Sequence, residues 1–228
     1  MESTARHADF ALDLWSSGTT PRLHAKKKSL IARERDAWQR AVFAAVQTGV
    51  AADDVVVLDE FGSTIDMTRR YARAPHGQRV CEQTPRNTPR NTTTLASLSI
   101  QGIGPSVVMS GGLTRAMFEA YIHDVLGPTL RAGQVIVLDN ARVHHGGRIA
   151  ELLAQRGCRA LYLPPYSPDY SPIELAFAKI KAYIRRCKAR TREALEQAIE
   201  QALALISSAD ARAFFAHCGY RLWPIRDQ

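Results

Sequence analysis

A chain of 228 residues, 46% of them hydrophobic, is long enough to form one large domain with a substantial core. Its formal net charge of +8 favours a polyanionic partner such as nucleic acid or an anionic membrane surface. No apolar run has the length of a transmembrane helix, residues 1–13 lack the core of a secretory signal, and the four dispersed cysteines argue against a zinc site and fit a reducing cytosol.

The first 50 residues divide into a stub and a linker. Residues 1–25 are weakly patterned, so we expect no stable element there. In residues 26–50, apolar residues recur at helical spacing between charged ones, which predicts an amphipathic helix over residues 29–48. Gly49 is a typical residue to end that helix. We therefore expect a linker helix ahead of a larger domain.

Two short apolar runs stop at acidic residues. Residues 55–58 are followed by Asp59 and Glu60, and residues 135–138 by Asp139. A run of β-branched residues without alternation is typical of a strand buried on both faces of a sheet. Because an open α/β sheet carries its chemistry at the carboxyl ends of its strands, Asp59 and Asp139 are predicted to lie at that rim.

A hairpin, a last strand and several helices complete the predicted elements. Residues 92–100 alternate as a strand does, residues 102–105 have turn chemistry, and residues 106–110 are predicted to be the hairpin partner. Residues 158–163 form a further short strand, and a proline-rich loop, residues 164–172, leads into a long helix. We expect the other helices over residues 114–126, 146–156, 191–206 and 209–216.

The order of these elements predicts an α/β fold. The first three strands have short or hairpin connections and suit antiparallel pairing, whereas the last two follow helical crossovers and should run parallel. We expect a mixed five-stranded sheet, with three antiparallel strands and then two parallel ones, and helices on both faces. This domain would span residues 51–220, which leaves residues 221–228 as a carboxyl-terminal tail.

Three acids are the candidate catalytic and metal-binding residues. Asp59 and Asp139 would stand side by side at one rim, and Glu174 begins the helix after the proline-rich loop. Carboxylates packed closely repel one another, and Mg²⁺, which prefers hard oxygen ligands, relieves that repulsion. Two such ions about 3.5–4 Å apart can activate a water or a 3′-hydroxyl and steady the leaving oxygen of a phosphodiester.

Each acid also has a purely structural interpretation. Asp59 with Glu60 is consistent with a strand-end turn, and Asp139 with helix capping. Glu174 is favoured at the positive end of its helix. Glu60 and Asp169 are competing ligands, although Asp169 lies in the middle of the proline-rich loop, which is more simply explained as shaping the rim.

Two histidines and two tyrosines near these acids each have more than one interpretation. His144 and His145 are compatible with a transition-metal site, but adjacent side chains rarely point the same way, which favours positioning or a phosphate contact. Tyr166 and Tyr170 either stack on an unpaired base or pack the proline-rich loop, and packing is the simpler interpretation.

Three motifs together resemble the signatures of the DDE transposases. LDEFG, LDNARVHHG and LPPYSPDYSPIE occur in that order and contain Asp59, Asp139 and Glu174. The resemblance is to the mariner-like insertion-sequence branch of bacteria, for which the spacing of 35 positions from Asp139 to Glu174 is typical. It covers roughly residues 26–220.

The resemblance implies a ribonuclease-H-like fold in which these three acids hold two Mg²⁺ or Mn²⁺ ions. The implied activity is cleavage of transposon ends in double-stranded DNA and transfer of the 3′-hydroxyl strand into target DNA. We also expect a homodimer on DNA, acting in the cytoplasm at the nucleoid and without a membrane.

Two features depart from the family pattern. Ser171 stands where the family usually has asparagine, a change that the metal site should tolerate. Relatives carry a helix-turn-helix region ahead of the core, whereas only the weakly patterned stub precedes Lys26 here. We therefore expect a catalytic half, from a second reading frame or a truncated copy, with an amino-terminal helix-turn-helix partner from an adjacent frame.

Basic residues after the first and third acids are predicted to contact DNA phosphates, without sequence preference. The alternative is that the cations of the long helix only form its solvated face. The predicted DNA-binding residues are Arg69, Arg70, Arg73, Arg79, His144, Lys179, Lys181, Arg185 and Arg186.

Two other functions remain open on the sequence alone. One is a non-catalytic DNA-binding remnant that keeps the fold, and the other is a different ribonuclease-H-like nuclease, such as a junction resolvase. An aspartyl-phosphate phosphatase is excluded, because it needs a second acid two positions after its nucleophile and Phe61 occupies that position after Asp59.

Overall fold

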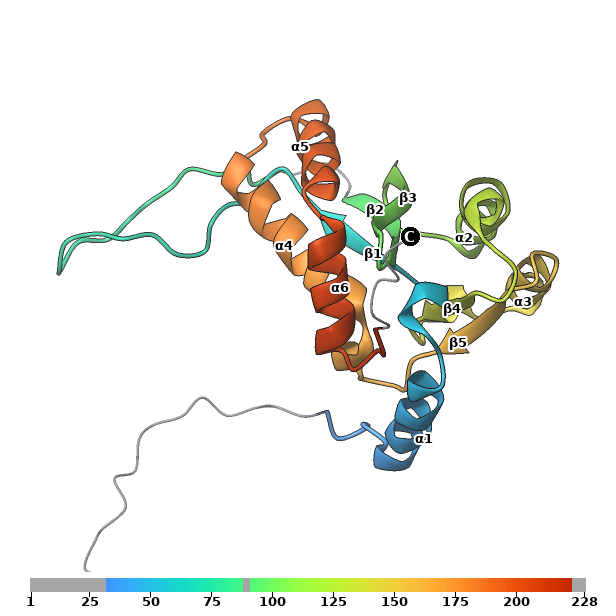
Figure 1. The fold of residues 1–228 in the computed structure, drawn as a ribbon. Coiled ribbons are helices and arrows are strands. Elements are labelled where there is room, and N and C mark those ends of the chain that lie inside the picture. Colours follow the sequence, from blue (N-terminus) through green and yellow to red (C-terminus); the bar gives the residue numbers. More distant parts are fainter. Residues whose placement is uncertain (1–31, 88–90, 223–228) are drawn as a thin grey trace, which may run out of the picture. The chain divides into compact units, whose positions relative to one another are not determined.

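Five strands form one mixed sheet, in the spatial order β3 (Gly102–Ser110), β2 (Thr92–Ser99), β1 (Val55–Ser63), β4 (Val135–Leu138) and β5 (Arg159–Tyr162) (Figure 1). The computed structural model describes residues 32–87 and 91–222. β2 pairs antiparallel with both β1 and β3, whereas β4 pairs parallel with both β1 and β5. The predicted sheet of three antiparallel and then two parallel strands is therefore confirmed.

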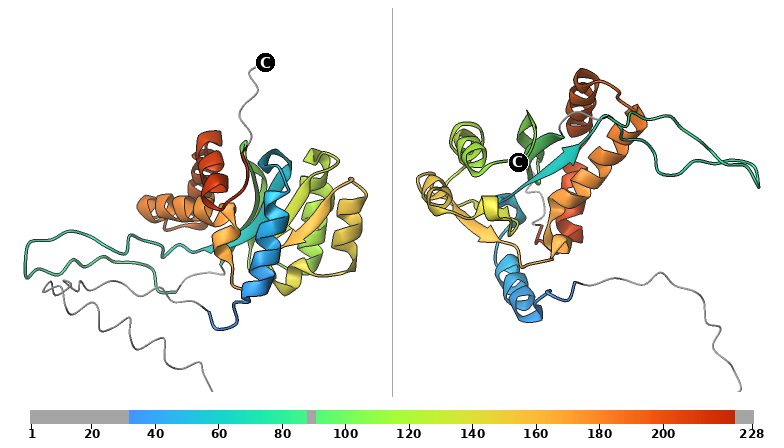
Figure 2. Two further views of the ribbon diagram at one scale, coloured as in Figure 1. Left: turned by 60° about the horizontal axis from the view of Figure 1, so that its bottom comes forward. Right: turned by 180° about the vertical axis from the view of Figure 1, so that it is seen from behind.

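Helices cover both faces of the sheet, as predicted (Figure 2). Because successive strand residues point to opposite faces, Val55 and Val57 lie in one core and Val56 and Leu58 in the other. All four are buried, which explains why this run shows no alternation. The first core lies beneath α4 (Pro172–Cys187), α5 (Arg192–Ala204) and α6 (Ser208–His217), and the second beneath α2 (Arg115–Ala120), its π-helical continuation and α3 (Gly147–Ala154).

Capping residues fix where several helices begin. Thr114 and Thr191 each accept a hydrogen bond from the backbone N–H three residues later. Ser207 and Asp210 form a capping box at the start of α6. Pro172 occupies the first position of α4, where its missing N–H is not needed. The predicted starts at Thr114, Pro172 and Thr191 are confirmed.

The linker helix α1 (Ala37–Thr48) is shorter than predicted. The Asp36 carboxylate accepts two backbone N–H groups of the first turn, so the helix begins there and residues 32–36 are not helical. Residues 29–31, which the prediction included, lie outside the described residues. The predicted end at Gly49 is confirmed.

The turn between β2 and β3 also differs from the prediction. It consists of residues 100–101, and the predicted turn residues 102–105 belong to β3. Gly102 has a φ of 118°, and a Cβ atom there would lie 3.1 Å from the carbonyl oxygen of Ile206. Glycine is therefore required for a close approach of two backbones. Pro105 is tolerated because β3 is an edge strand.

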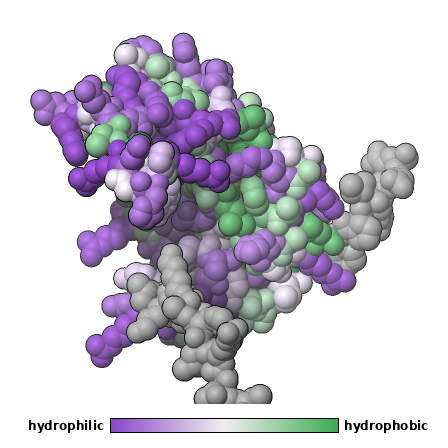
Figure 3. Space-filling model, turned by 90° about the vertical axis from the view of Figure 1, so that its left-hand side faces the viewer, coloured by the Kyte–Doolittle hydropathy of each residue, from purple (hydrophilic) through white to green (hydrophobic). Residues whose placement is uncertain are grey.

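A long segment without helix or strand connects β1 to β2 and projects beyond α4 (Figures 1 and 2). It is anchored after the end of α4, where Lys188 pairs with Glu82 at 2.7 Å and Arg190 donates to the carbonyl oxygens of Ile65 and Met67. Hydrophilic side chains dominate the face from which it projects (Figure 3).

Two predicted segments cannot be compared with the structure. The stub, residues 1–25, and residues 223–228 of the tail lie outside the described residues. Arg221, the first residue of the predicted tail, forms an isolated bridge with Ala51. Among the described residues, no helix combines the length and apolar character needed to cross a membrane.

Candidate active site

Asp59 and Asp139 occupy adjacent positions on two neighbouring strands of the sheet. β1 and β4 are parallel neighbours with Leu58 opposite Leu138, and each aspartate is the next residue along its chain. The prediction that these two strands lie side by side is therefore confirmed. Asp139 follows the end of β4, as predicted, but β1 continues past Asp59 to Ser63, and Asp59 pairs with Ala96 of β2. The predicted strand end at Asp59 is therefore wrong, and the two acids meet because β4 ends beside the middle of β1.

Glu174 lies in the first turn of α4 and faces the same pocket as the two aspartates. The pocket has a volume of about 350 Å³. Its remaining wall is the proline-rich loop, together with Asn140 and Leu163. Three acids that are far apart in the sequence thus line one concave surface.

Glu60, a competing ligand on the sequence, points away from this pocket. Asp59 alternates with Val57 and Phe61, which pack beneath α4, whereas Glu60 faces the other side of the sheet. There its carboxylate lies against His144. The alternation of strand β1 therefore separates the two neighbouring acids.

The environment of Asp59 disfavours its charge. Burial is the main cause that raises the pKa of Asp59 to about 8, and the nearby charge of Asp139 raises it further. Glu174 contributes a weaker repulsion, while a hydrogen bond from the backbone N–H of Glu60, at 2.8 Å, acts in the opposite direction. The side chain is only 9% exposed, so water does little to screen these effects.

Asp139 is stabilised as a carboxylate. Burial raises its pKa, but hydrogen bonds from His144 and the backbone N–H of Ala141 outweigh burial, so the pKa lies below its usual value. His144 shows the complementary shift: burial lowers its pKa, yet Asp139 and Glu60 together raise it to about 9. One aspartate is therefore paired with a cation, and the other is not.

These donors fit a divalent cation in their chemistry. Within the described ranges, no three side chains of ligand type converge tightly enough to enclose a metal ion. Mg²⁺, however, is typically bound by one or two carboxylates together with substrate phosphates and water, so an open pocket with carboxylate walls suits it. A cation held by Asp59, Asp139 and Glu174 would also relieve the repulsion that raises the pKa of Asp59.

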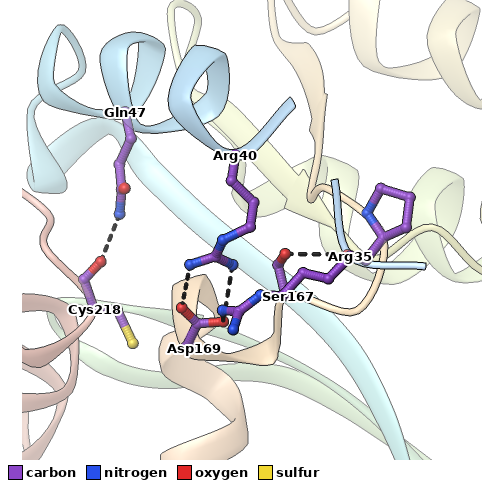
Figure 4. A network of polar contacts seen from close by, with 7 residues as sticks. Arg35, Arg40, Gln47, Ser167, Asp169 and Cys218 are labelled. Atoms are coloured by element: carbon purple, nitrogen blue, oxygen red, sulfur yellow. Dashed lines mark hydrogen bonds and ion pairs between the residues drawn. The ribbon is translucent and has the colours of Figure 1, made fainter. Parts of the chain in front are cut away.

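Asp169, the other competing ligand, is held by two arginines (Figure 4). Arg40 of α1 forms two hydrogen bonds to its carboxylate, at 2.6 and 3.0 Å, and Arg35 forms a third at 2.7 Å. Gln47 of α1 donates a further bond to the carbonyl oxygen of Cys218. Asp169 therefore fixes the proline-rich loop to the linker helix.

Loss of the hydrogen bonds from Arg40 to Asp169 should make the proline-rich loop, which forms one wall of the pocket, more mobile. We expect Arg40→Ala to lower the free energy of unfolding by about 1 kcal/mol, because a bidentate ion pair is stronger than an ordinary surface pair. Hydrogen exchange of the backbone at residues 166–171 should become faster. The control is Arg192→Ala, which removes the exposed pair with Glu196 and should change neither measurement. Equal effects of the two substitutions would contradict a role of the Arg40–Asp169 pair in holding the proline-rich loop.

The two tyrosines of the loop differ. Tyr170 packs against Phe43, with ring centroids 5.1 Å apart, and Arg40 lies 4.3 Å above its ring. Tyr166 instead has an exposed side chain and a φ of 52°, and it lines the pocket. The expectation of packing fits Tyr170 and does not fit Tyr166.

The predicted DNA-binding residues of α4 separate onto two faces. At 100° per residue, Lys181 and Arg185 share the face of Glu174, whereas Lys179 and Arg186 lie roughly 120–140° around the helix. Lys179 is paired there with Asp210 of α6 at 2.8 Å. Only the first face continues from the acidic rim.

The remaining predicted DNA contacts lie elsewhere. Arg69, Arg70, Arg73 and Arg79 are exposed on the segment that projects beyond α4, so the structure does not bring them to the acidic rim (Figure 1). The side chain of His144 is fully buried, so none of its ring atoms faces solvent where a phosphate would lie. Its alternative, positioning, agrees with its contacts.

Sequence reasoning missed two pairings in this site. The pairing of Arg35 and Arg40 with Asp169 could not be predicted from local sequence, because the partners lie 134 and 129 positions apart. The pairing of Glu60 with His144 follows from strand alternation, which places Glu60 on the opposite face from Asp59. That signal was present in the sequence.

Solved structures share the fold of this chain. The Mos1 transposase paired-end complex with the left transposon end has a TM-score of 0.69 and 14% identity, covering 92% of this chain and 66% of that one. The Mos1 mariner paired-end complex with Mn has a TM-score of 0.63 and 14% identity, and the match covers 92% of this chain and 66% of that one. The catalytic domain of Mos1 mariner transposase gives 0.57 and 11%, covering 85% of this chain and 91% of that one.

These TM-scores show a common fold, the ribonuclease-H-like transposase fold that the sequence predicts. The chain spans slightly less than two thirds of the length of the Mos1 chains in the paired-end complexes. A sequence comparison with curated proteins finds no match. The family model described as DDE superfamily endonuclease matches residues 54–196, well over half of the chain, and the chain therefore belongs to this family.

Proposed function

We propose that this chain is the catalytic core of an insertion-sequence transposase, which cleaves DNA at transposon ends and joins the 3′-hydroxyl strand to target DNA. The observation that carries this proposal is the pocket into which β1, β4 and α4 each bring one carboxylate. Asp59 is buried next to the charge of Asp139, and a divalent cation bound between them would relieve their repulsion.

In this proposal Asp59, Asp139 and Glu174 hold two Mg²⁺ or Mn²⁺ ions. The bound ions would activate the attacking water or 3′-hydroxyl and stabilise the leaving oxygen. The proline-rich loop, fixed by Arg35 and Arg40, shapes the wall against which the scissile strand would lie. One Mos1 complex of the same fold contains the left transposon end and another contains Mn, which supports DNA and a divalent cation as the binding partners of this chain.

Nicking of supercoiled plasmid with Mn²⁺ tests the proposal. We expect the purified chain to nick it and Asp139→Asn to reduce nicking at least a thousandfold, because the substitution removes a metal-binding charge while it keeps the shape of the side chain. Binding to DNA, measured by fluorescence anisotropy, should persist in the variant. No nicking by either protein would favour the remnant, and a strong preference for four-way junctions would favour a resolvase.

Lys181 is the proposed contact for a phosphate of the scissile strand. It lies on the face of α4 that carries Glu174, 5.6 Å from the ring centroid of Phe61, and it has no carboxylate partner among the described residues. We expect Lys181→Ala to weaken binding to all DNA sequences similarly and to reduce the slope of log K against log [salt] by about 1.

The control for Lys181 is Lys179→Ala, on the face of α4 that packs toward α6. Because Lys179 is already paired with Asp210, this substitution should change the slope much less. Effects of equal size, or an effect of Lys181→Ala confined to one DNA sequence, would contradict the proposed contact.

The same proposal includes a homodimer on DNA and action at the nucleoid in the cytoplasm. Arg69, Arg70, Arg73, Arg79, Arg185 and Arg186 remain proposed DNA contacts. Analytical ultracentrifugation of the chain with a duplex of the transposon end should give a 2:1 complex. A 1:1 complex at saturation would contradict the dimer.

A further inference from the structure

His144 is a fully buried polar side chain held between two carboxylates. Its Nδ1 atom hydrogen-bonds Oδ1 of Asp139, and its Nε2 atom lies 3.3 Å from Oε2 of Glu60. The second contact has an ion-pair distance without hydrogen-bond geometry, and both of its atoms are buried without another partner. The imidazole thus links Glu60 of β1 to Asp139, the residue that follows β4.

The surroundings of His144 leave the ring little freedom. The ring of Phe118 packs against it with centroids 4.4 Å apart, and the hydroxyl of Tyr162 donates to its backbone carbonyl at 2.9 Å. A short 3-10 turn, Arg142–His144, returns the chain toward Asp139. The ring orientation is therefore fixed from the side chain and from the backbone.

The two oxygens of Asp139 have different environments as a result. Oδ1 accepts hydrogen bonds from His144 Nδ1 and from the backbone N–H of Ala141, the latter at 2.9 Å. Oδ2 has no hydrogen-bond partner in the described part of the chain. The side chain is 42% exposed and lines the pocket, so the available oxygen is Oδ2.

We propose that His144 is a positioning residue for Asp139, holding Oδ1 so that Oδ2 is the oxygen presented to a divalent cation. This inference rests on the proposed function, because it concerns the same pocket. Hydrogen bonds that orient a metal ligand typically contribute 10–100-fold to metal affinity. Glu60 has a supporting role, since it restrains the other nitrogen of the ring.

Asparagine and glutamine at position 144 distinguish the two contacts. The amide nitrogen of asparagine is as many bonds from Cα as Nδ1 of histidine, and that of glutamine as many as Nε2. His144→Asn therefore keeps a donor for Asp139, whereas His144→Gln keeps one only for Glu60. We expect Mn²⁺ affinity, measured by electron paramagnetic resonance without DNA, to stay within about threefold of wild type in the first variant and to fall about 10–100-fold in the second.

His145 supplies the matched control. It is exposed, its ring stacks on Tyr162 at 4.4 Å, and its Nε2 atom contacts Asn140 rather than Asp139. His145→Asn should leave Mn²⁺ affinity unchanged. Equal affinities of the two variants at position 144, or a loss in His145→Asn as large as in His144→Gln, would overturn the inference.

A measurement on the folded wild type covers the case in which His144→Gln does not fold. Two-dimensional ¹⁵N–¹H spectra of the histidine rings should show a proton on Nδ1 of His144, and its resonances should move in Asp139→Asn while those of His145 do not. An unprotonated Nδ1, or no response to Asp139→Asn, would overturn the inference alone. Absence of Mn²⁺ binding by wild type would overturn both this inference and the metal site of the proposed function.

Discussion

Asp59→Asn is expected to abolish nicking and, at the same time, to stabilise the metal-free protein. The buried carboxylate faces the charge of Asp139, and the two effects raise its pKa to about 8. Because this pKa is above the value of 3.8 for an unperturbed aspartate, the folded state binds the extra proton, and the stability of wild type should fall as pH rises from about 4 to about 8. The neutral amide removes this loss.

Thermal and urea unfolding in EDTA measure this effect. At pH 7 we expect the free energy of unfolding of Asp59→Asn to exceed that of wild type on the order of a few kcal/mol, with no difference near pH 4. Mn²⁺ should stabilise wild type and not the variant. A variant less stable than wild type at pH 7 in EDTA would show that Asp59 is a structural residue and not a strained ligand.

Phe177→Ala is expected to have a large effect on both stability and nicking. The side chain is 1% exposed and packs against Phe61 with ring centroids 4.7 Å apart, which joins α4 to β1. Truncation of a buried phenylalanine leaves a cavity and lowers the free energy of unfolding by about 3–5 kcal/mol. Phe177 follows Glu174 by less than one helical turn, so α4 should shift and nicking by the folded fraction should fall about tenfold or more.

Phe215→Ala is the matched control for Phe177→Ala. Phe215 is also fully buried, but it belongs to α6, which carries none of the three acids. We expect a similar loss of stability, measured by urea unfolding, with near wild-type nicking at a temperature where both variants are folded. Equal loss of nicking in both variants would contradict the role of α4 packing in placing Glu174.

The parts of the fold that the sequence predicted are those with strong local signals. The runs at residues 55–58 and 135–138 are buried on both faces of the sheet, and their composition alone indicates this. The caps at Thr114 and Thr191 and the proline at the start of α4 depend on neighbouring residues only. The two buried runs and one helix start located the three acids, although β1 continues past Asp59 to Ser63 because residues 59–63 pair with β2.

The parts that the sequence did not predict depend on contacts between distant residues. The start of the linker helix was predicted too early, because the apolar pattern extends beyond the Asp36 cap. Gly102 was interpreted as part of a turn, yet it is required by the approach of the Ile206 carbonyl, about 100 positions away. The burial of His144 depends on Glu60 and Phe118 together, and a pair of adjacent histidines in the sequence does not indicate which one turns inward.

Anomalous scattering from Mn²⁺ in crystals of the chain with a transposon-end duplex tests the central claim most directly. The account predicts Mn²⁺ peaks in the pocket, within coordination distance of Asp59, Asp139 and Glu174, and predicts that they disappear in Asp139→Asn. Peaks at other surfaces, with the pocket empty while the crystallised protein still nicks DNA, would contradict it.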